Sequence, residues 1–198
     1  MKKLQIILYT IIMATTAINA QEDLKYQLPP ESILKLADYQ RPPGVTIDSR
    51  NEYMLLSYRN TYKSLEDLNQ TEISLAGLRV NPVTNISSSA SYISQFKIRK
   101  VKDKEPIDIK GLPAKMKIAN VSWSPDETKV AFTNTTETGV EVWVLEFATA
   151  SAKKLTSATV NANLGNPINW YRDGKSLLIR MLPEQRPALV DSKKALPD

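Results

Sequence analysis

The sequence predicts an all-β fold made of repeated units, and two observations carry this prediction. A motif at residues 121–132 recurs at residues 168–179, 47 positions further on, with Trp170 matching Trp123. In both copies an apolar residue and the Trp precede a tight polar turn, and an apolar strand follows. The chain also has twelve Pro against six Gly, which favours turns over long helices. Self-similarity at about 40–50 residues is typical of β-propeller blades, so we expect a partial β-propeller with about three blades visible.

The first segment, residues 1–20, is predicted to be a signal peptide. Lys2 and Lys3 form a charged start, an apolar run follows to Met13, and small residues lead to a cleavage site after Ala20. The apolar run is too short to span a bilayer. We therefore expect export to the periplasm or the cell exterior, without stable membrane insertion.

Residues 21–44 are predicted to form an N-terminal arm. Pro29 and Pro30 precede an apolar–polar stretch that favours two helical turns over residues 31–37. The sequence Pro42-Pro43-Gly44 then ends the helix.

The incomplete propeller is expected over residues 45–198, with blade starts near 45, 121 and 168. The first start places Ile47 where the later copies have Trp. A strand over 53–58 follows, and a polar insertion between Asn60 and Ser91, with a short helix at 64–68, explains why the first two starts lie 76 residues apart. Further strands are expected at 93–101 and 107–109.

The second blade is predicted to continue with strands at 129–133, 140–147 and 153–156, and the third with a strand at 176–181. A closed propeller needs roughly four to eight blades. An arc of three would leave a blade edge unpaired. We therefore expect the chain to be part of a longer protein.

Composition excludes several kinds of chemistry. The chain contains neither His nor Cys, so a Ser-His-Asp triad, a disulfide and a thiolate metal site are all impossible within it. No Gly-x-Ser-x-Gly elbow, phosphate-binding loop or calcium loop is present. We predict no catalytic, cofactor-binding or metal-binding residue in this chain. The net charge of +5 falls to +3 without Lys2 and Lys3, which does not predict nucleic-acid binding.

Two aspartates in the repeated motif invite a catalytic or metal-binding reading, but their neighbours favour turns. Asp126 follows a Pro in the position that a type I turn prefers, and Asp173 precedes Gly174 in a hairpin dipeptide. The three Trp residues fall at positions where core packing is favoured over ligand stacking.

An ordered set of segments resembles one known family. These segments are residues 26–30, 75–82, 111–113, 123–126, 139–143, 155–156, 161–165 and 177–180. The family is the prolyl oligopeptidase-type serine peptidases, in the branch similar to glutamyl endopeptidases. The resemblance implies that this chain corresponds to the N-terminal propeller, which restricts substrate entry to a C-terminal α/β-hydrolase domain carrying Ser, Asp and His. It implies peptide substrates for the parent protein and no activity for this chain, which stops before the hydrolase domain.

Arg79 is the candidate substrate-binding residue, because an acidic substrate side chain requires a cation and Arg binds both carboxylate oxygens in one plane. The alternative is that Arg79 pairs with Glu66, Asp67 or Glu72 and holds the insertion in place. A second function also stays open: a non-enzymatic periplasmic propeller module that binds protein partners.

Overall fold

The computed structural model describes residues 28–37 and 39–186, which fall in two compact units. The first unit, residues 1–39, contains helix α2 (Glu31–Ala37), which covers the predicted helical turns. An ion pair of 2.9 Å joins Lys35 to Glu31 one turn away, and no residue of α2 is buried. The predicted signal peptide (1–20) lies outside the described residues.

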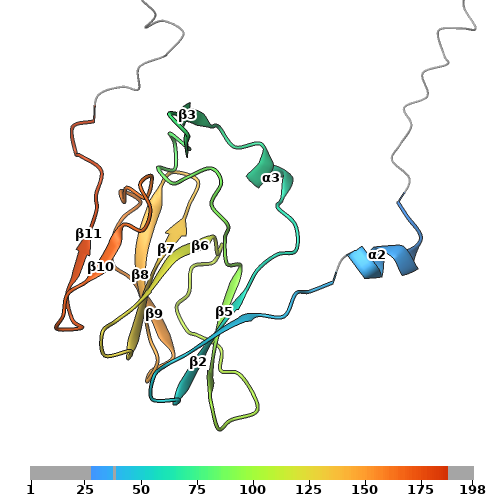
Figure 1. Ribbon diagram of the computed structural model, residues 1–198, viewed down its shortest axis with the longest axis vertical. Coiled ribbons are helices and arrows are strands. Elements are labelled where there is room, and N and C mark those ends of the chain that lie inside the picture. Colours follow the sequence, from blue (N-terminus) through green and yellow to red (C-terminus); the bar gives the residue numbers. More distant parts are fainter. Residues whose placement is uncertain (1–27, 38, 187–198) are drawn as a thin grey trace, which may run out of the picture. The chain divides into compact units, whose positions relative to one another are not determined.

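The second unit, residues 40–198, is built from antiparallel β-sheets (Figure 1). Its elements in chain order are β1 (Gly44–Ile47), β2 (Tyr53–Tyr58), α3 (Leu65–Leu68), β3 (Ile73–Leu75), β4 (Leu78–Val80), β5 (Gln95–Lys100), β6 (Ile118–Trp123), β7 (Lys129–Thr135), β8 (Val140–Glu146), β9 (Ser151–Lys154), β10 (Ile168–Trp170) and β11 (Leu177–Ile179). The sheets have the orders β1-β2-β5 and β6-β7-β8-β9, and β3–β4 and β10–β11 form separate pairs. The predicted all-β character is confirmed, and no closed barrel or propeller is present in the described part.

Three β-hairpins share one geometry, as the repeated motif predicts. The pairs that close the turns are Ile47↔Met54, Trp123↔Val130 and Trp170↔Leu177, and each pair is separated by seven positions. The fourth residue of each turn has a positive φ, and these residues are Asn51, Glu127 and Gly174. Trp123 and Trp170 therefore occupy equivalent places, and Ile47 takes the same place in the first hairpin.

Successive hairpins touch one another at these turns. The backbone N–H and the hydroxyl of Ser49 both donate to Glu127 Oε2 at 2.6 Å. The indole Nε1–H of Trp170 donates to the Ser122 carbonyl at 3.0 Å. The Cα of Gly174 packs so closely that an added Cβ would lie 3.1 Å from the Asp126 carboxyl carbon. The three hairpins consequently lie side by side in chain order, with their turns toward the same end of the unit in Figure 1.

Two hydrophobic clusters cover the two faces of the β6–β9 sheet. The first joins it to the β1-β2-β5 sheet, where Phe96 and Phe132 meet edge to face at 5.4 Å. The second joins it to β10 and β11 and includes Val142, Val160 and Ile168. Six of the seven β7 residues are buried, as expected for a strand packed on both faces. Trp123 contributes to packing by stacking on Phe147 at 4.8 Å.

The connection between β2 and β5, residues 59–94, is hereafter the insertion. Its helix α3 begins after Ser64, whose hydroxyl and backbone N–H exchange hydrogen bonds with Asp67 in a capping box. At its other end, the Asn85 carbonyl accepts a hydrogen bond of 2.9 Å from the Ala162 N–H, which anchors the insertion near β10. No helix in the described ranges is long and apolar enough to cross a membrane.

Candidate functional site

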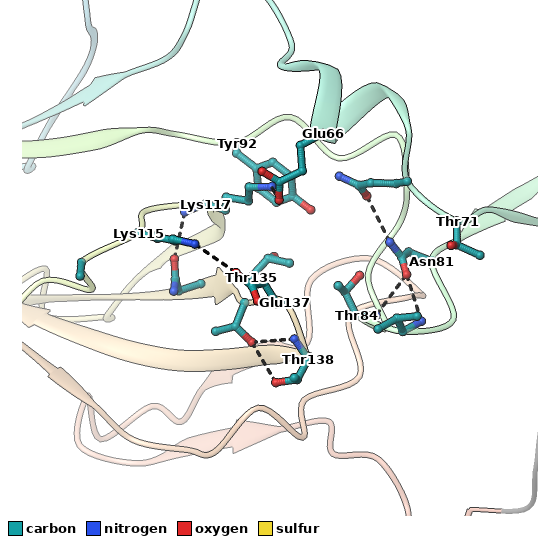
Figure 2. A pocket seen from close by; sticks show the side chains of 15 residues that line it. Glu66, Thr71, Asn81, Thr84, Tyr92, Lys115, Lys117, Thr135, Glu137 and Thr138 are labelled. Carbon is teal, nitrogen blue, oxygen red and sulfur yellow. Dashed lines mark hydrogen bonds and ion pairs between the residues drawn. The ribbon is translucent and has the colours of Figure 1, made fainter.

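A cavity of about 700 Å³ lies where the insertion meets the β6–β9 sheet. Its walls come from the insertion, from residues 114–117 before β6, and from residues 134–138 at the junction of β7 and β8. Because β7 runs from the repeated turn to this junction, the cavity lies at the opposite end of the sheet from the three turns. Figure 2 shows Lys115, Lys117, Thr135, Glu137 and Thr138 on one side and Asn81 and Thr84 on the other.

Lys117 joins the three walls. Its Nζ lies 3.0 Å from Glu66 Oε1 and 3.0 Å from Asp67 Oδ1, both on α3. Its backbone N–H donates to Asn134 Oδ1 at 3.0 Å, and its carbonyl accepts from the Thr135 N–H at 3.0 Å. The Lys117 side chain is 29% exposed, so its charge is partly withdrawn from water. Lys117 therefore fixes α3 to the end of β7.

The charges around Lys117 stabilise one another. Burial raises the pKa of Asp67, but the hydrogen bonds from Lys117 and Ser64 outweigh it and hold the pKa below its usual value. Burial lowers the pKa of Lys117, but its bonds to Asp67 and Glu66 raise it overall. Asp67 and Lys117 therefore both stay ionised at neutral pH.

Tyr92 lies beside this cluster, with the Lys117 ammonium 6.0 Å from its ring centroid. Burial raises the pKa of its phenol, so the hydroxyl is neutral at physiological pH. Figure 2 shows Tyr92 next to Glu66 and Lys117.

Two other features shape the walls. The Asn81 side-chain oxygen accepts hydrogen bonds from the N–H groups of Val83 and Thr84, at 3.0 and 3.1 Å, which fixes the loop after β4. Lys115 and Glu137 form a 3.0 Å ion pair whose side chains are 88% and 79% exposed. This pair therefore belongs to the open side of the cavity.

Arg79 does not line this cavity. It lies on β4, its side chain is 64% exposed, and its Nη1 is 3.5 Å from Glu72 Oε1. The structure thus contains one of the carboxylate pairings that the sequence analysis set against a substrate contact. Substrate contact by Arg79 stays a prediction.

Asp126 and Asp173 act within their turns. Asp126 Oδ1 accepts from the Ser124 hydroxyl at 2.6 Å, and this bond is the main cause of its lowered pKa. Asp173 Oδ1 accepts from the N–H groups of Lys175 and Ser176 at 2.8 and 3.0 Å, which lowers its pKa in the same way. Among the described residues no group of three or more acidic side chains is arranged to hold a metal ion.

Lys117 and Tyr92 were not predicted from the sequence as site residues. Lys117 is separated by 50 residues from Asp67, and no motif connects the two positions. The insertion itself was the available signal, because a long connection with no core of its own must be held by contacts elsewhere in the chain.

Comparison with known proteins gives two relatives with similar names. The chain is 27% identical over 173 residues to a protein of Arabidopsis thaliana named "Probable glutamyl endopeptidase, chloroplastic", with 81% of this chain and 18% of that protein covered. It is 24% identical over 187 residues to a rice protein (Oryza sativa subsp. japonica) of the same name, with 85% and 20% covered. The chain thus spans about a fifth of the length of these relatives. No protein-family profile matches it, and no solved structure matches it significantly.

These similarities relate the chain distantly to proteins that are named as peptidases. Both relatives are named as peptidases, and the aligned region covers most of this chain. The fold defines the structural class of the chain: it consists mainly of several antiparallel sheets with few helices, and its hairpins repeat.

Proposed function

We propose that residues 45–198 form adjacent blades of a β-propeller that belongs to an exported serine peptidase of the prolyl oligopeptidase type. In this proposal the propeller restricts access of peptides to a C-terminal α/β-hydrolase domain of the same polypeptide. The relatives named glutamyl endopeptidases support the peptidase part. The observation that carries the proposal is the chain of contacts between the three equivalent turns, from Ser49 to Glu127 and from Trp170 to Ser122.

This arrangement matches what blades of a propeller require. Neighbouring blades must pack face to face while their equivalent turns stay at one end. Both faces of the β6–β9 sheet are covered here, one by the preceding repeat and the other by the following repeat. The hairpin contacts therefore favour a continuing circular stack over a two-layer sandwich.

The test is the coding sequence that follows Asp198 and the activity of its full product. We expect further Trp–turn–strand repeats, then a Gly-x-Ser-x-Gly elbow and a later His. The full protein should hydrolyse fluorogenic peptides and lose that activity with a serine-directed inhibitor. The 198-residue chain alone should show no hydrolysis, because it has no His to act as general base. A coding sequence that ends at Asp198, or that continues with blades only, would favour a non-enzymatic binding module.

Arg79 gives a test of substrate preference. In the full protein we would compare kcat/KM for Glu and Leu peptides before and after Arg79→Gln. Direct contact with an acidic side chain should reduce kcat/KM for the Glu peptide alone, by about 1.5–3 kcal/mol in transition-state free energy. An equal change for both peptides would assign Arg79 to its ion pair with Glu72.

Export is proposed from residues 1–20 alone. Amino-terminal sequencing of the protein recovered from its native cells should begin at Gln21. Recovery from the cytoplasm of a protein that retains Met1 would contradict the proposed export.

A further inference from the structure

We propose that the cavity beneath the insertion binds an uncharged, hydrogen-bonding stretch of peptide, in which a Gln or Asn side chain enters with its flanking amides. This inference rests on the proposed function, for which it names an accessory binding site for the substrate. The cavity volume of about 700 Å³ falls within the roughly 300–1,000 Å³ that is typical of small-ligand sites.

Both ammonium groups of the cavity are already paired with carboxylates, which argues against an anionic ligand. Glu66 is held by Lys117, which also binds Asp67, and Glu137 is held by Lys115. An anionic ligand would have to break one of these pairs or bring in a negative charge without a counter-charge. Burying an unpaired charge is far more costly than burying an amide that finds hydrogen bonds.

Two hydroxyl groups of the cavity wall are left for a ligand. Thr135 Oγ1 and Thr84 Oγ1 are buried atoms without a hydrogen-bond partner at bonding geometry, and the Thr135 residue is only 6% exposed. The Thr135 hydroxyl is also near enough to the Tyr92 phenol to act against the burial that raises the pKa of that phenol. Thr84 comes from the insertion and Thr135 from the end of β7, so the two hydroxyls stand on facing walls (Figure 2).

The chemistry of these groups fits an amide. A hydroxyl donates one hydrogen bond and accepts others, while a carboxamide offers two N–H donors and one carbonyl acceptor. A carboxamide therefore carries both the donors and the acceptor that hydroxyl groups on two walls can use. A sugar should bind less well. The carboxylates that would accept hydrogen bonds from its hydroxyl groups are already paired, and the Lys117 ammonium lies near the face of the Tyr92 ring on which a sugar would stack.

The experiment measures binding to the purified 198-residue chain by calorimetry and by backbone amide NMR shifts. The probe is acetyl-Ala-Gln-Ala-amide, compared with the Glu and Leu versions of the same peptide and with maltotriose. We expect the Gln peptide to bind most tightly and to shift the amides of Asn81, Val83 and Thr84 and of residues 134–138. Because no cleavage is measured, this result does not depend on whether the full protein is a peptidase.

Thr135→Val is the decisive variant, because it keeps the shape of the side chain and removes a buried hydroxyl that makes no hydrogen bond at bonding geometry. It should leave thermal stability unchanged or slightly raised, and weaken the Gln peptide about threefold to tenfold. Thr46→Val, on the exposed strand β1, is the matched control and should leave the affinity unchanged. Thr84→Val should weaken binding independently.

The proposal is overturned by any of three results. The first is no binding of the Gln peptide at 10 mM or below, a concentration of the order expected for a weak tripeptide ligand. The second is equal or tighter binding of the Glu peptide or of maltotriose. The third is an unchanged affinity in both Thr variants while their folds remain intact.

Discussion

The link between Lys117 and helix α3 gives a sharp prediction, because little else holds that part of the insertion. No residue of α3 is buried, and Leu65 and Leu68 are exposed. Lys117→Met keeps the length and most of the apolar stem of the side chain but removes the ammonium. We expect α3 to detach locally while the sheets remain folded.

The expected magnitude follows from the two ion pairs. Asp67 is 20% exposed and Lys117 29%, so their charged hydrogen bond should contribute about 1.5–2 kcal/mol. Glu66 is 73% exposed, and its pair should add no more than about 0.5 kcal/mol. A loss of about 2 kcal/mol corresponds to about 30-fold faster hydrogen exchange at the α3 amides that bond back to Ser64.

Native-state hydrogen exchange of the Asp67 and Leu68 amides is the assay. Lys115→Met is the control, since its pair with Glu137 is almost fully exposed, and it should change exchange by less than about twofold. Unchanged exchange in Lys117→Met, or equal changes in both variants, would refute the reasoning.

The same link has a defined pH dependence. The folded pKa of Asp67 is lowered, so its contribution is complete above the unfolded value of 3.8 and disappears as the pH falls through the lower folded value. The difference in α3 hydrogen-exchange protection between wild type and Lys117→Met should therefore become smaller below pH 3.8.

Two further predictions concern the repeated turns. Gly174→Ala should cost about 2 kcal/mol in free energy of unfolding, because φ is +64° and the new Cβ would press on the Asp126 carboxylate. Gly165→Ala, with φ +75° and open space around it, should cost only about 1 kcal/mol. Equal losses of unfolding free energy in the two variants would contradict a close contact between Gly174 and Asp126. Trp170→Phe should cost about 1–2 kcal/mol in free energy of unfolding, measured by urea denaturation, because it removes the hydrogen bond to Ser122. Trp143→Phe is the control, since Trp143 bonds to Glu141 on its own strand. A loss for Trp170→Phe no greater than that for Trp143→Phe would argue against a role of Trp170 between repeats.

The positions of the hairpin strands along the chain were predictable from the sequence, because they depend on local patterns. The repeated Trp, the polar turn and the apolar run that follows place β6–β7 and β10–β11 to within a few residues. The weaker first copy was also readable, since Ile47 stands where an apolar residue must pair across the turn with Met54.

The site was not predictable in the same way, because its contacts join residues far apart in the chain. The Lys117–Asp67 pair spans 50 residues and depends on how a long connection folds back. Arg79 drew notice through resemblance, but its β4 position places it beside Glu72 and outside the cavity.

The two ends of the β6–β9 sheet have different roles for a physical reason. At the turn end, Asp126, Asp173 and Glu127 use their carboxylates on neighbouring backbone and hydroxyl groups, so their hydrogen-bonding capacity serves the repeat itself. At the other end, the insertion breaks the repeat, and the Thr84 and Thr135 hydroxyls remain without partners. Unused buried hydrogen-bonding groups are what a ligand needs, since each new bond recovers a desolvation cost already present in the fold. Recognition by this chain is therefore expected at the insertion, where the sequence departs from its own repeat.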